Sequence, residues 1–316
     1  MQNKDREFRQ RGVALVLVLW MLALLMVMVA GYSAGMHSES LLSAHQLGSA
    51  QSRALAQSGI WLAVNELLQP QTDTSWRRDG TAYPVDLDGG HVQIRIYDEA
   101  GKIDLNTARV ELLNGLLKSA DLSDEESLHV LQAILDWRDR DNLKRQFGAE
   151  DDDYKAAGYD YGAKDGPFNS VEELRLVMGV TEDLFQKISP ALTVYSHQAT
   201  VNPDVAPREV LAALSSSDEK TIDDFIDNRN ADVPGGSATI EGMDSRFISR
   251  TRGRIFSISS EGSAGDSRIT IEAVVLQKSN ATPPYSVLSW WESKPQPAEQ
   301  DVTGADGKPN DDDTSL

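Results

Sequence analysis

The 316-residue sequence contains no cysteine, which excludes disulfide bonds, a thiol nucleophile, zinc–thiolate sites and a lipid-modified cysteine anchor. Histidine is scarce as well, with five residues scattered along the chain. Gly-x-Ser-x-Gly, phosphate-binding-loop and His-Glu-x-x-His motifs are all missing. Asp139-Arg140-Asp141 matches the Asp-x-Asp of some glycosyltransferases, but no Rossmann-like βαβ pattern surrounds it. The sequence therefore predicts a protein that is not an enzyme.

Basic residues are few relative to acidic ones. The chain has 30 Lys and Arg against 49 Asp and Glu, a formal net charge of -19 at pH 7. Binding to nucleic acid depends on Lys and Arg displacing counterions from phosphates, so this balance argues against a nucleic-acid partner. It favours cations or basic surfaces instead.

The N-terminal segment is the longest apolar run in the chain. Residues 13–30 would rise about 27 Å as a helix, and residues 13–36 would cover the hydrocarbon core of a bilayer. Four basic residues precede this run and no Lys or Arg follows it until Arg53, which predicts a single membrane pass with a cytoplasmic N-terminus. The alternative is a cleaved signal peptide on a released binding module that starts near Gly35, although such peptides have shorter apolar cores.

The helix is predicted to continue beyond the membrane. Leu47, Ala54, Trp61 and Leu68 recur every seven residues, and no proline occurs before Pro70. A helix over residues 13–69 would be about 85 Å long.

The rest of the chain mixes strands with a long helical region. Residues 91–98 alternate apolar and polar side chains, and residues 255–260 and 269–276 flank a glycine-rich turn, so we expect three strands in one antiparallel sheet against the helix. Residues 104–247 then form a helical insertion. Residues 281–316 are expected to form a C-terminal tail, and their composition from about Ser293 onward is typical of disorder.

The insertion contains an internal repeat. Residues 103–116 and 201–214 align without gaps at an offset of 98 residues, which indicates two related helical modules. Such modules resemble helix-hairpin-helix DNA-binding repeats, and residues 178–181 keep one of the hairpin glycines. A membrane-anchored DNA-binding protein of a competence pathway is therefore the alternative function, although neither module has a basic flank.

Seven carboxylates lie between residues 136 and 153. Carboxylates this close repel each other unless they are solvated or neutralised, and calcium, with six to eight oxygen ligands, is the cation that fits best in an exported protein. Leu143 and Lys144 at positions five and six of the loop exclude a standard EF-hand. The alternative is a solvated acidic loop, moderated by the neighbouring basic side chains Arg138, Arg140, Lys144 and Arg145.

The leader resembles the class III leader of type IV pilins and type II secretion pseudopilins. A short basic stretch ends in Gly12, and the apolar helix begins at Val13. The resemblance implies cleavage after Gly12 by a prepilin peptidase and methylation of the new N-terminus at Val13. Leu17 replaces the glutamate usual at the fifth mature position. That glutamate is thought to meet the amine of the preceding subunit, so its absence indicates a subunit at the tip.

Four further motifs are similar to the K family of type II secretion minor pseudopilins: DWRDRD, GAEDDDY, FNSVEELRLVMGV and VNPDVAPREVL. The likeness extends over residues 12–278. It implies an α+β, pilin-like fold with a long N-terminal helix on a small antiparallel sheet and a large inserted all-α domain. The expected parts are a leader at 1–12, a membrane segment at 13–36, a pilin-like domain at 37–103 and 248–280, the insertion at 104–247 and a tail at 281–316.

The resemblance also implies function and site residues. The protein would start or cap the pseudopilus tip with the I and J minor pseudopilins, and would support protein export across the outer membrane. Leu17, Leu47, Ala54 and Trp61 would belong to the assembly helix. The candidate calcium ligands are Asp136, Asp139, Asp141, Glu150, Asp151 and Asp152.

Overall fold

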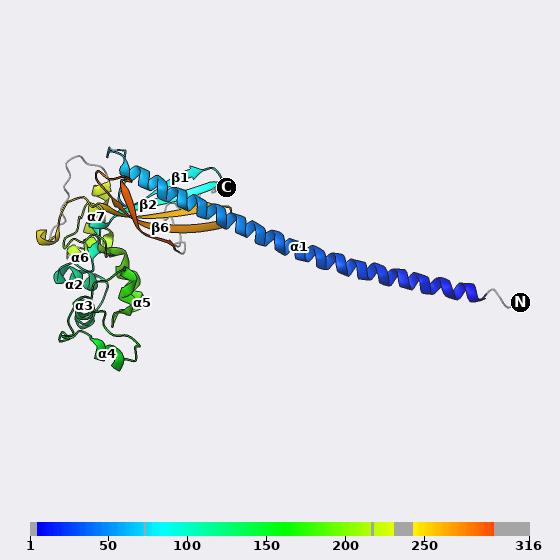
Figure 1. The fold of residues 1–316 in the computed structure, drawn as a ribbon, viewed down its shortest axis with the longest axis horizontal. Helices are drawn as coiled ribbons and strands as arrows, with labels where there is room; N and C mark the ends of the chain where they lie inside the picture. The colour runs from blue at the N-terminus through cyan, green and yellow to red at the C-terminus, as the bar shows by residue number, and fades with distance from the viewer. Residues whose placement is uncertain (1–4, 73, 216–217, 231–242, 294–316) are drawn as a thin grey trace, which may run out of the picture.

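One helix dominates the shape of the molecule. The computed structural model describes residues 5–72, 74–215, 218–230 and 243–293. Helix α1 (Asp5–Leu68) has 64 residues, which corresponds to about 96 Å at 1.5 Å per residue. It projects from the rest of the protein, which comprises a sheet and a mainly helical head formed by the segment between residues 99 and 254 (Figure 1). The predicted long helix is confirmed, and it begins before residue 13.

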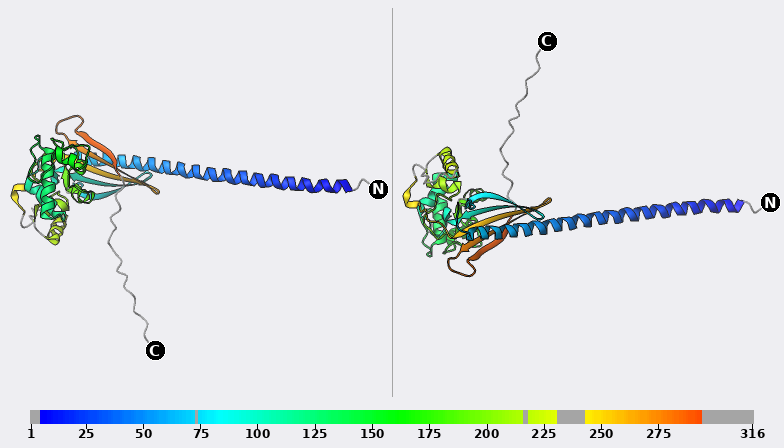
Figure 2. Two further views of the ribbon diagram at one scale, coloured as in Figure 1. Left: turned by 90° about the horizontal axis from the view of Figure 1, so that it is seen from below. Right: turned by 90° about the horizontal axis from the view of Figure 1, so that it is seen from above.

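The N-terminal half of α1 extends away from the rest of the protein in all three views (Figures 1 and 2). The large apolar side chains described between Leu15 and Val29 are each about half exposed or more. Across the described residues, no helix holds a run of sufficient length and apolarity to pass through a membrane. The helical backbone passes through Gly12 and Val13, but their side chains lie outside the described ones.

The C-terminal half of α1 packs across a five-stranded antiparallel sheet with the order β1-β2-β5-β6-β7. The strands are β1 (Asp79–Leu87), β2 (Gly90–Asp98), β5 (Ile255–Ala264), β6 (Ser267–Gln277) and β7 (Tyr285–Ser293). The three predicted strands are β2, β5 and β6, and each is confirmed. Strands β1 and β7 were not predicted.

The tail boundary predicted from the sequence is wrong. Residues 281–316 were assigned to a tail, whereas residues 285–293 pair with β6 as strand β7. Tyr, Val, Leu and two Trp give this segment a high β-propensity, but it lacks the polar alternation that identified the other strands. Residues 294–316 lie outside the described part of the chain.

The core between α1 and the sheet is apolar and closely packed. Ile60 and Ala63 from the helix are buried with Ile94, Phe256 and Ala273 from the sheet. Two glycines set the distance between the layers. A Cβ atom at Gly59 would lie 2.1 Å from Ser260 Oγ, and one at Gly262 would lie 2.2 Å from the Ser52 carbonyl oxygen. The backbone of β5 therefore touches the helix backbone at Gly262, and the helix backbone at Gly59 touches side chains of the sheet.

The head is inserted between β2 and β5 and lies at the end of the sheet away from the N-terminus of α1 (Figure 2). It contains α2 (Val110–Ser119), α3 (Asp124–Arg138), α4 (Asp151–Ala156), α5 (Glu182–Ile188), α6 (Arg208–Leu214) and α7 (Glu219–Asn230). Its short 3-10 helices include η2 (Val171–Leu176), η3 (Ser189–Ala191) and η4 (Ser245–Phe247). The head is not wholly helical, because β3 (Ile103–Asp104) and β4 (Leu192–Thr193) form a parallel pair.

The two repeated segments adopt the same local structure. Asp104 Oδ1 accepts a hydrogen bond from the Asn106 backbone N–H at 2.9 Å, and 98 residues later Asn202 Oδ1 accepts one from the Asp204 N–H at 3.1 Å. Ile103 pairs with β4, and Val201 forms the equivalent parallel bridge to Ile248. The helices that follow, α2 and α6, pack against each other.

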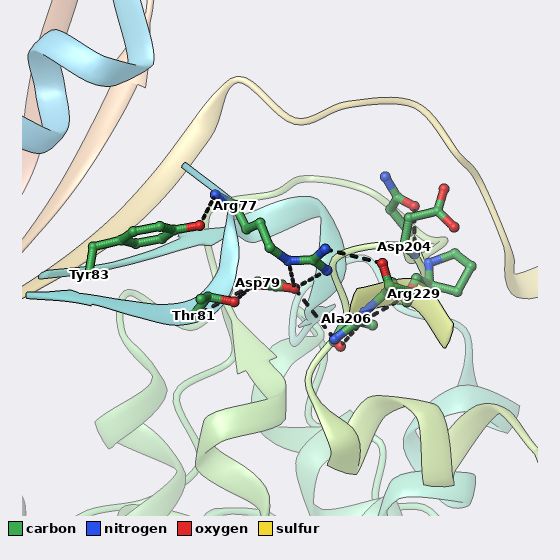
Figure 3. Close-up of polar contacts among 9 residues, drawn as sticks. Arg77, Asp79, Thr81, Tyr83, Asp204, Ala206 and Arg229 are labelled. Atoms are coloured by element: carbon green, nitrogen blue, oxygen red, sulfur yellow. Dashed lines mark hydrogen bonds and ion pairs between the residues drawn. The ribbon is translucent and has the colours of Figure 1, made fainter. Parts of the chain in front are cut away.

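Buried charges join the head to the sheet (Figure 3). Asp79 on β1 accepts a hydrogen bond from Arg77 at 2.6 Å and lies 3.8 Å from the guanidinium of Arg229 on α7. Burial alone would raise the pKa of Asp79, but hydrogen bonds from Arg77 and Thr81 outweigh it and lower the pKa. Arg229 also donates to the Ala206 carbonyl at 2.8 Å. One carboxylate thus connects both parts of the protein.

A second buried carboxylate completes this junction. Glu99, in the 3-10 helix η1 (Glu99–Gly101), is almost completely buried and pairs with Lys102 Nζ at 2.7 Å. Its other hydrogen bonds come from Ser257 Oγ on β5, at 2.5 Å, and from Thr193 Oγ1 on β4. Since a buried charge without partners is costly, these bonds hold β4 of the head against β5 of the sheet.

We predict that Gly59→Ala lowers the free energy of unfolding by about 1–3 kcal/mol, because the added methyl group would overlap Ser260 and Val92. Gly48→Ala is the matched control, since a Cβ there would lie 3.3 Å from Ser267 Cβ and the higher helix propensity of alanine applies to both changes. Urea denaturation of the full chain in detergent, followed by circular dichroism, measures both. Equal effects would contradict the close contact between Gly59 and the sheet.

Candidate functional site

The acidic residues predicted as ligands surround the end of α3 and the start of α4. Asp136 is in the last turn of α3 and is fully buried, and Asp139 is the residue at which the helix ends. Glu150 immediately precedes α4, and Asp151 begins it. The intervening loop carries Asp141, whose carboxylate accepts a hydrogen bond from the Leu143 backbone N–H at 3.0 Å.

One arginine lies inside this acidic cluster. Arg145 Nη1 is 2.5 Å from both Asp136 Oδ1 and Asp139 Oδ2. Two further basic side chains have other partners: Lys144 pairs with Asp153, and Arg138 donates to the carbonyls of Leu105 and Ala108. The Arg145 guanidinium is therefore shared between two carboxylates.

Several carboxylate oxygens in the cluster are buried without a hydrogen-bond partner. They are Asp139 Oδ1, both Oε atoms of Glu150, and Asp165 Oδ1. Burial, followed by repulsion from Asp136, Asp165, Asp139 and Asp141, raises the pKa of Glu150 to about 7. Burial also raises the pKa of Asp165, with further contributions from Asp151, Asp139 and Asp141. The cluster thus holds more negative charge than its protein partners neutralise.

Two glycines leave room for these carboxylates. A Cβ atom at Gly148 would lie 1.8 Å from Asp136 Oδ2, and a Cβ at Gly162 would lie 1.8 Å from Asp151 Oδ1. Any side chain at either position would displace a carboxylate. The glycine of the GAED motif therefore has a steric role beside the acidic cluster.

The structure changes the set of candidate ligands at two positions. Asp152 is exposed on the outer side of α4, and none of the pKa shifts in the cluster involves it. Asp165, which the sequence reading missed, faces the cluster from the loop after α4. The residue has a positive φ of 54°, so a tight backbone turn brings it back toward α3. Its place in the sequence, beyond the acidic run, gave no signal for this role.

The residues present suit a hard cation such as calcium, which prefers carboxylate oxygens. As the side chains are placed, no three or more His, Asp or Glu residues among those described are arranged to hold a metal ion. The buried oxygens without donors are nevertheless the kind of groups that a bound cation would satisfy. Asp139, Glu150 and Asp165 carry these oxygens, and the charges of Asp136, Asp141 and Asp151 raise the pKa of Glu150 or of Asp165.

An aromatic cluster packs between α3 and α4, next to the acidic loop. Tyr154 on α4 is fully buried and its hydroxyl accepts a hydrogen bond from the Met178 backbone N–H at 3.0 Å. The Trp137 ring packs against Tyr154 and Phe168, with ring centroids 5.8 and 6.3 Å away. These contacts fix α4 relative to α3, so the backbone around the carboxylates is held by apolar packing.

The predicted assembly residues all lie on the exposed surface of α1. Leu17, Leu47, Ala54 and Trp61 are solvent-facing, and Trp61 is 46% exposed. Beside Trp61, a groove of about 610 Å³ runs between α1 and the β1–β2 turn. It is lined by Gln51, Ala54, Leu55, Ser58, Trp61, Leu62, Leu87, Asp88 and Gly89.

The chain is similar to proteins of one secretion system. The family model described as type II secretion system (T2SS), protein K matches residues 95–197. Type II secretion system protein K of Pseudomonas aeruginosa is 28% identical over 70% of this chain and 72% of its own length. The protein of the same name from Aeromonas hydrophila is 25% identical over 85% of this chain and 93% of its own length.

The fold also matches a solved structure. The crystal structure of the GspK-GspI-GspJ complex from the type 2 secretion system of enterotoxigenic Escherichia coli contains a chain that aligns with a TM-score of 0.56. The alignment covers 82% of this chain and 99% of that one at 17% identity, which confirms the predicted α+β, pilin-like fold. The domain match over residues 95–197 and the sequence relatives show that this chain is similar to type II secretion system protein K.

Proposed function

We propose that the protein is a non-enzymatic minor pseudopilin that occupies the tip of a type II secretion pseudopilus. There it would start or cap assembly and support protein export across the outer membrane. The observation that carries this proposal is the architecture: a long exposed helix joined to a sheet, with a large head inserted between β2 and β5. The similarity to type II secretion system protein K supports it.

The position at the tip follows from size. Subunits of a helical fibre stack through their N-terminal helices, so each must leave room for the next subunit above it. The head extends sideways from the end of the sheet (Figure 1). A subunit of this width can begin a stack, but it would clash with its neighbours inside one. Leu17, in place of a glutamate, also removes the group that would pair with a preceding subunit.

The proposed partners are minor pseudopilins of the I and J families. The chain of similar fold was solved in a complex named for GspK, GspI and GspJ. The exposed apolar face of α1, with the groove beside Trp61, is the surface on which we place assembly. Small and apolar side chains along one helix face allow a second helix to approach closely.

The proposal places the protein in the inner membrane through residues 13–36, with the bulk of the chain in the periplasm. A prepilin peptidase would cleave after Gly12 and methylate Val13. The exposed apolar side chains from Leu15 to Val29 support this assignment, because such a surface is unfavourable in water.

We also propose that calcium binds the acidic cluster. Asp136, Asp139, Asp141, Glu150, Asp151 and Asp165 would supply the ligands. The bound ion would offset repulsion among carboxylates whose buried oxygens have no donors. Arg145, which faces Asp136 and Asp139, neutralises part of that charge and orients both carboxylates. The role of the ion would be to stabilise the head.

Maturation tests the pseudopilin assignment. In a host with its prepilin peptidase, we expect the protein from membranes to begin at a methylated Val13, measured by intact mass and N-terminal sequencing. Gly12→Val should leave the leader attached, because a bulky residue at the cleavage position blocks the peptidase. A mature N-terminus near Gly35, or the absence of processing, would contradict the proposal.

Co-purification with the I and J pseudopilins tests the tip complex separately.

Calcium titration tests the ion site. Calcium at a hundred times its dissociation constant should raise the free energy of unfolding by about 2.7 kcal/mol, as measured by thermal denaturation of the full chain in detergent. Glu150→Gln and Asp165→Asn should reduce that gain. Asp152→Asn is the matched control and should keep it, because Asp152 is exposed. Loss of the gain in all three variants would indicate a general charge effect.

The raised pKa of Glu150 predicts a pH dependence in calcium-free buffer. Its pKa is about 7 in the folded protein and about 4.5 as a free side chain, so the folded state binds more protons between these values. The free energy of unfolding should therefore fall as pH rises from about 4.5 to 7 and stay lower above that range. Glu150→Gln should flatten this slope relative to Asp152→Asn. Identical slopes in both variants would refute the role of Glu150.

A further inference from the structure

Strand β7 forms an unusual edge of the sheet. In the described part of the chain, no strand pairs with its outer side. Residues 285–291 contain no charge, in a protein where 25% of the residues are charged. Four large apolar side chains of this strand are between 37% and 43% exposed: Val287, Leu288, Trp290 and Trp291. Exposed edge strands are usually protected by Lys, Pro or inward charges, because their free backbone groups recruit other strands.

The opposite edge of the same sheet shows such protection. Strand β1 carries Pro84, Asp86 and Gly80, and its pairing with β2 is interrupted between Asp79 and Ala82. Proline has no N–H to offer an incoming strand, and a charge disfavours an apolar contact. β7 lacks these features apart from one irregularity between Val287 and Ser289 and the terminal Glu292. The contrast indicates that the free edge of β7 can pair with another strand.

The side chains of β7 would contact an added strand on both faces of the sheet. Trp290 lies opposite Ala273 and so points to the α1 face, whereas its neighbour Trp291 lies opposite Glu272 and points to the other face. Trp290 and Tyr285 pack on Trp61 of α1, with ring centroids 5.9 Å apart in each case. The edge is therefore continuous with the helix surface that carries the assembly residues.

We propose that β7 accepts an extended, uncharged strand from a neighbouring minor pseudopilin as a sixth strand of the sheet. This inference rests on the proposed function, because it names the surface by which a tip partner binds. The backbone N–H and C=O groups on the free edge supply hydrogen bonds, and the two tryptophans supply apolar contact. A strand of six to nine residues matches the nine residues of β7.

Hydrogen exchange tests this pairing directly. The full chain in detergent is compared alone and after co-purification with its I and J companions, and the amide exchange of residues 285–293 is measured by mass spectrometry. Pairing should slow exchange in this segment at least tenfold. Trp290→Lys should weaken complex formation at least tenfold. Ala82→Lys, which places the same charge on the opposite edge, should leave it unchanged.

The outcomes separate the two proposals. If the complex forms but exchange in β7 is unchanged, or if Trp290→Lys binds as the unmodified protein does, the strand-addition proposal is wrong and the tip assignment stands. If the unmodified chain forms no complex with the I and J companions, both proposals fail. The exchange measurement on the unmodified protein needs no variant, so a folding defect of Trp290→Lys cannot obscure the result.

Discussion

The backbone contact between α1 and strand β5 is the constraint on which the rest of the structure depends. Gly59 and Gly262 let the helix approach the strand until no Cβ atom would fit between them. Apolar side chains such as Ile60, Ile94 and Phe256 are then buried on both sides of the contact. This contact fixes the C-terminal half of the helix, while the N-terminal half projects away from the sheet (Figure 1). The outward face of α1 therefore presents its side chains in a defined direction.

The head depends on this frame through a different kind of interaction. Its own core is a separate apolar cluster, and its connection to the sheet runs through the buried carboxylates Asp79 and Glu99. Charged groups in such a position have strict requirements for geometry, since each lost partner leaves an unpaired charge. The pairs of Asp79 and Glu99 therefore favour the orientation of the head in which both carboxylates keep their partners. A fixed orientation matters for a subunit whose width decides where in a fibre it can sit.

Much of this fold could be predicted from the sequence, and the failures have physical reasons. Regular apolar periodicity identified α1, β2 and the β5–β6 hairpin, because each buries one face. β1 was missed because Gly80 and Pro84 interrupt its pattern, and β7 because it is apolar without alternation and was taken for part of the tail. Among the acidic residues, the prediction rests on the assumption that neighbours in sequence are neighbours in space. That held for Asp136 and Glu150, but helix α4 turns Asp152 outward, and a turn at Asp165 brings in a carboxylate from outside the acidic run.

The two proposed sites also lie at different ends of the molecule. Helices α3 and α4, which carry the acidic cluster, lie at the far side of the head from α1 (Figure 1). The assembly residues and β7 lie on the helix and the sheet. An ion bound at the cluster would touch no residue of the assembly surface, so its influence on assembly could act only through the stability and shape of the head. The contacts of Asp79 and Glu99 link the head to the sheet, so a change in the head can affect the assembly surface. A head that keeps its fold and orientation excludes a further subunit above it, whereas a partly unfolded head would not.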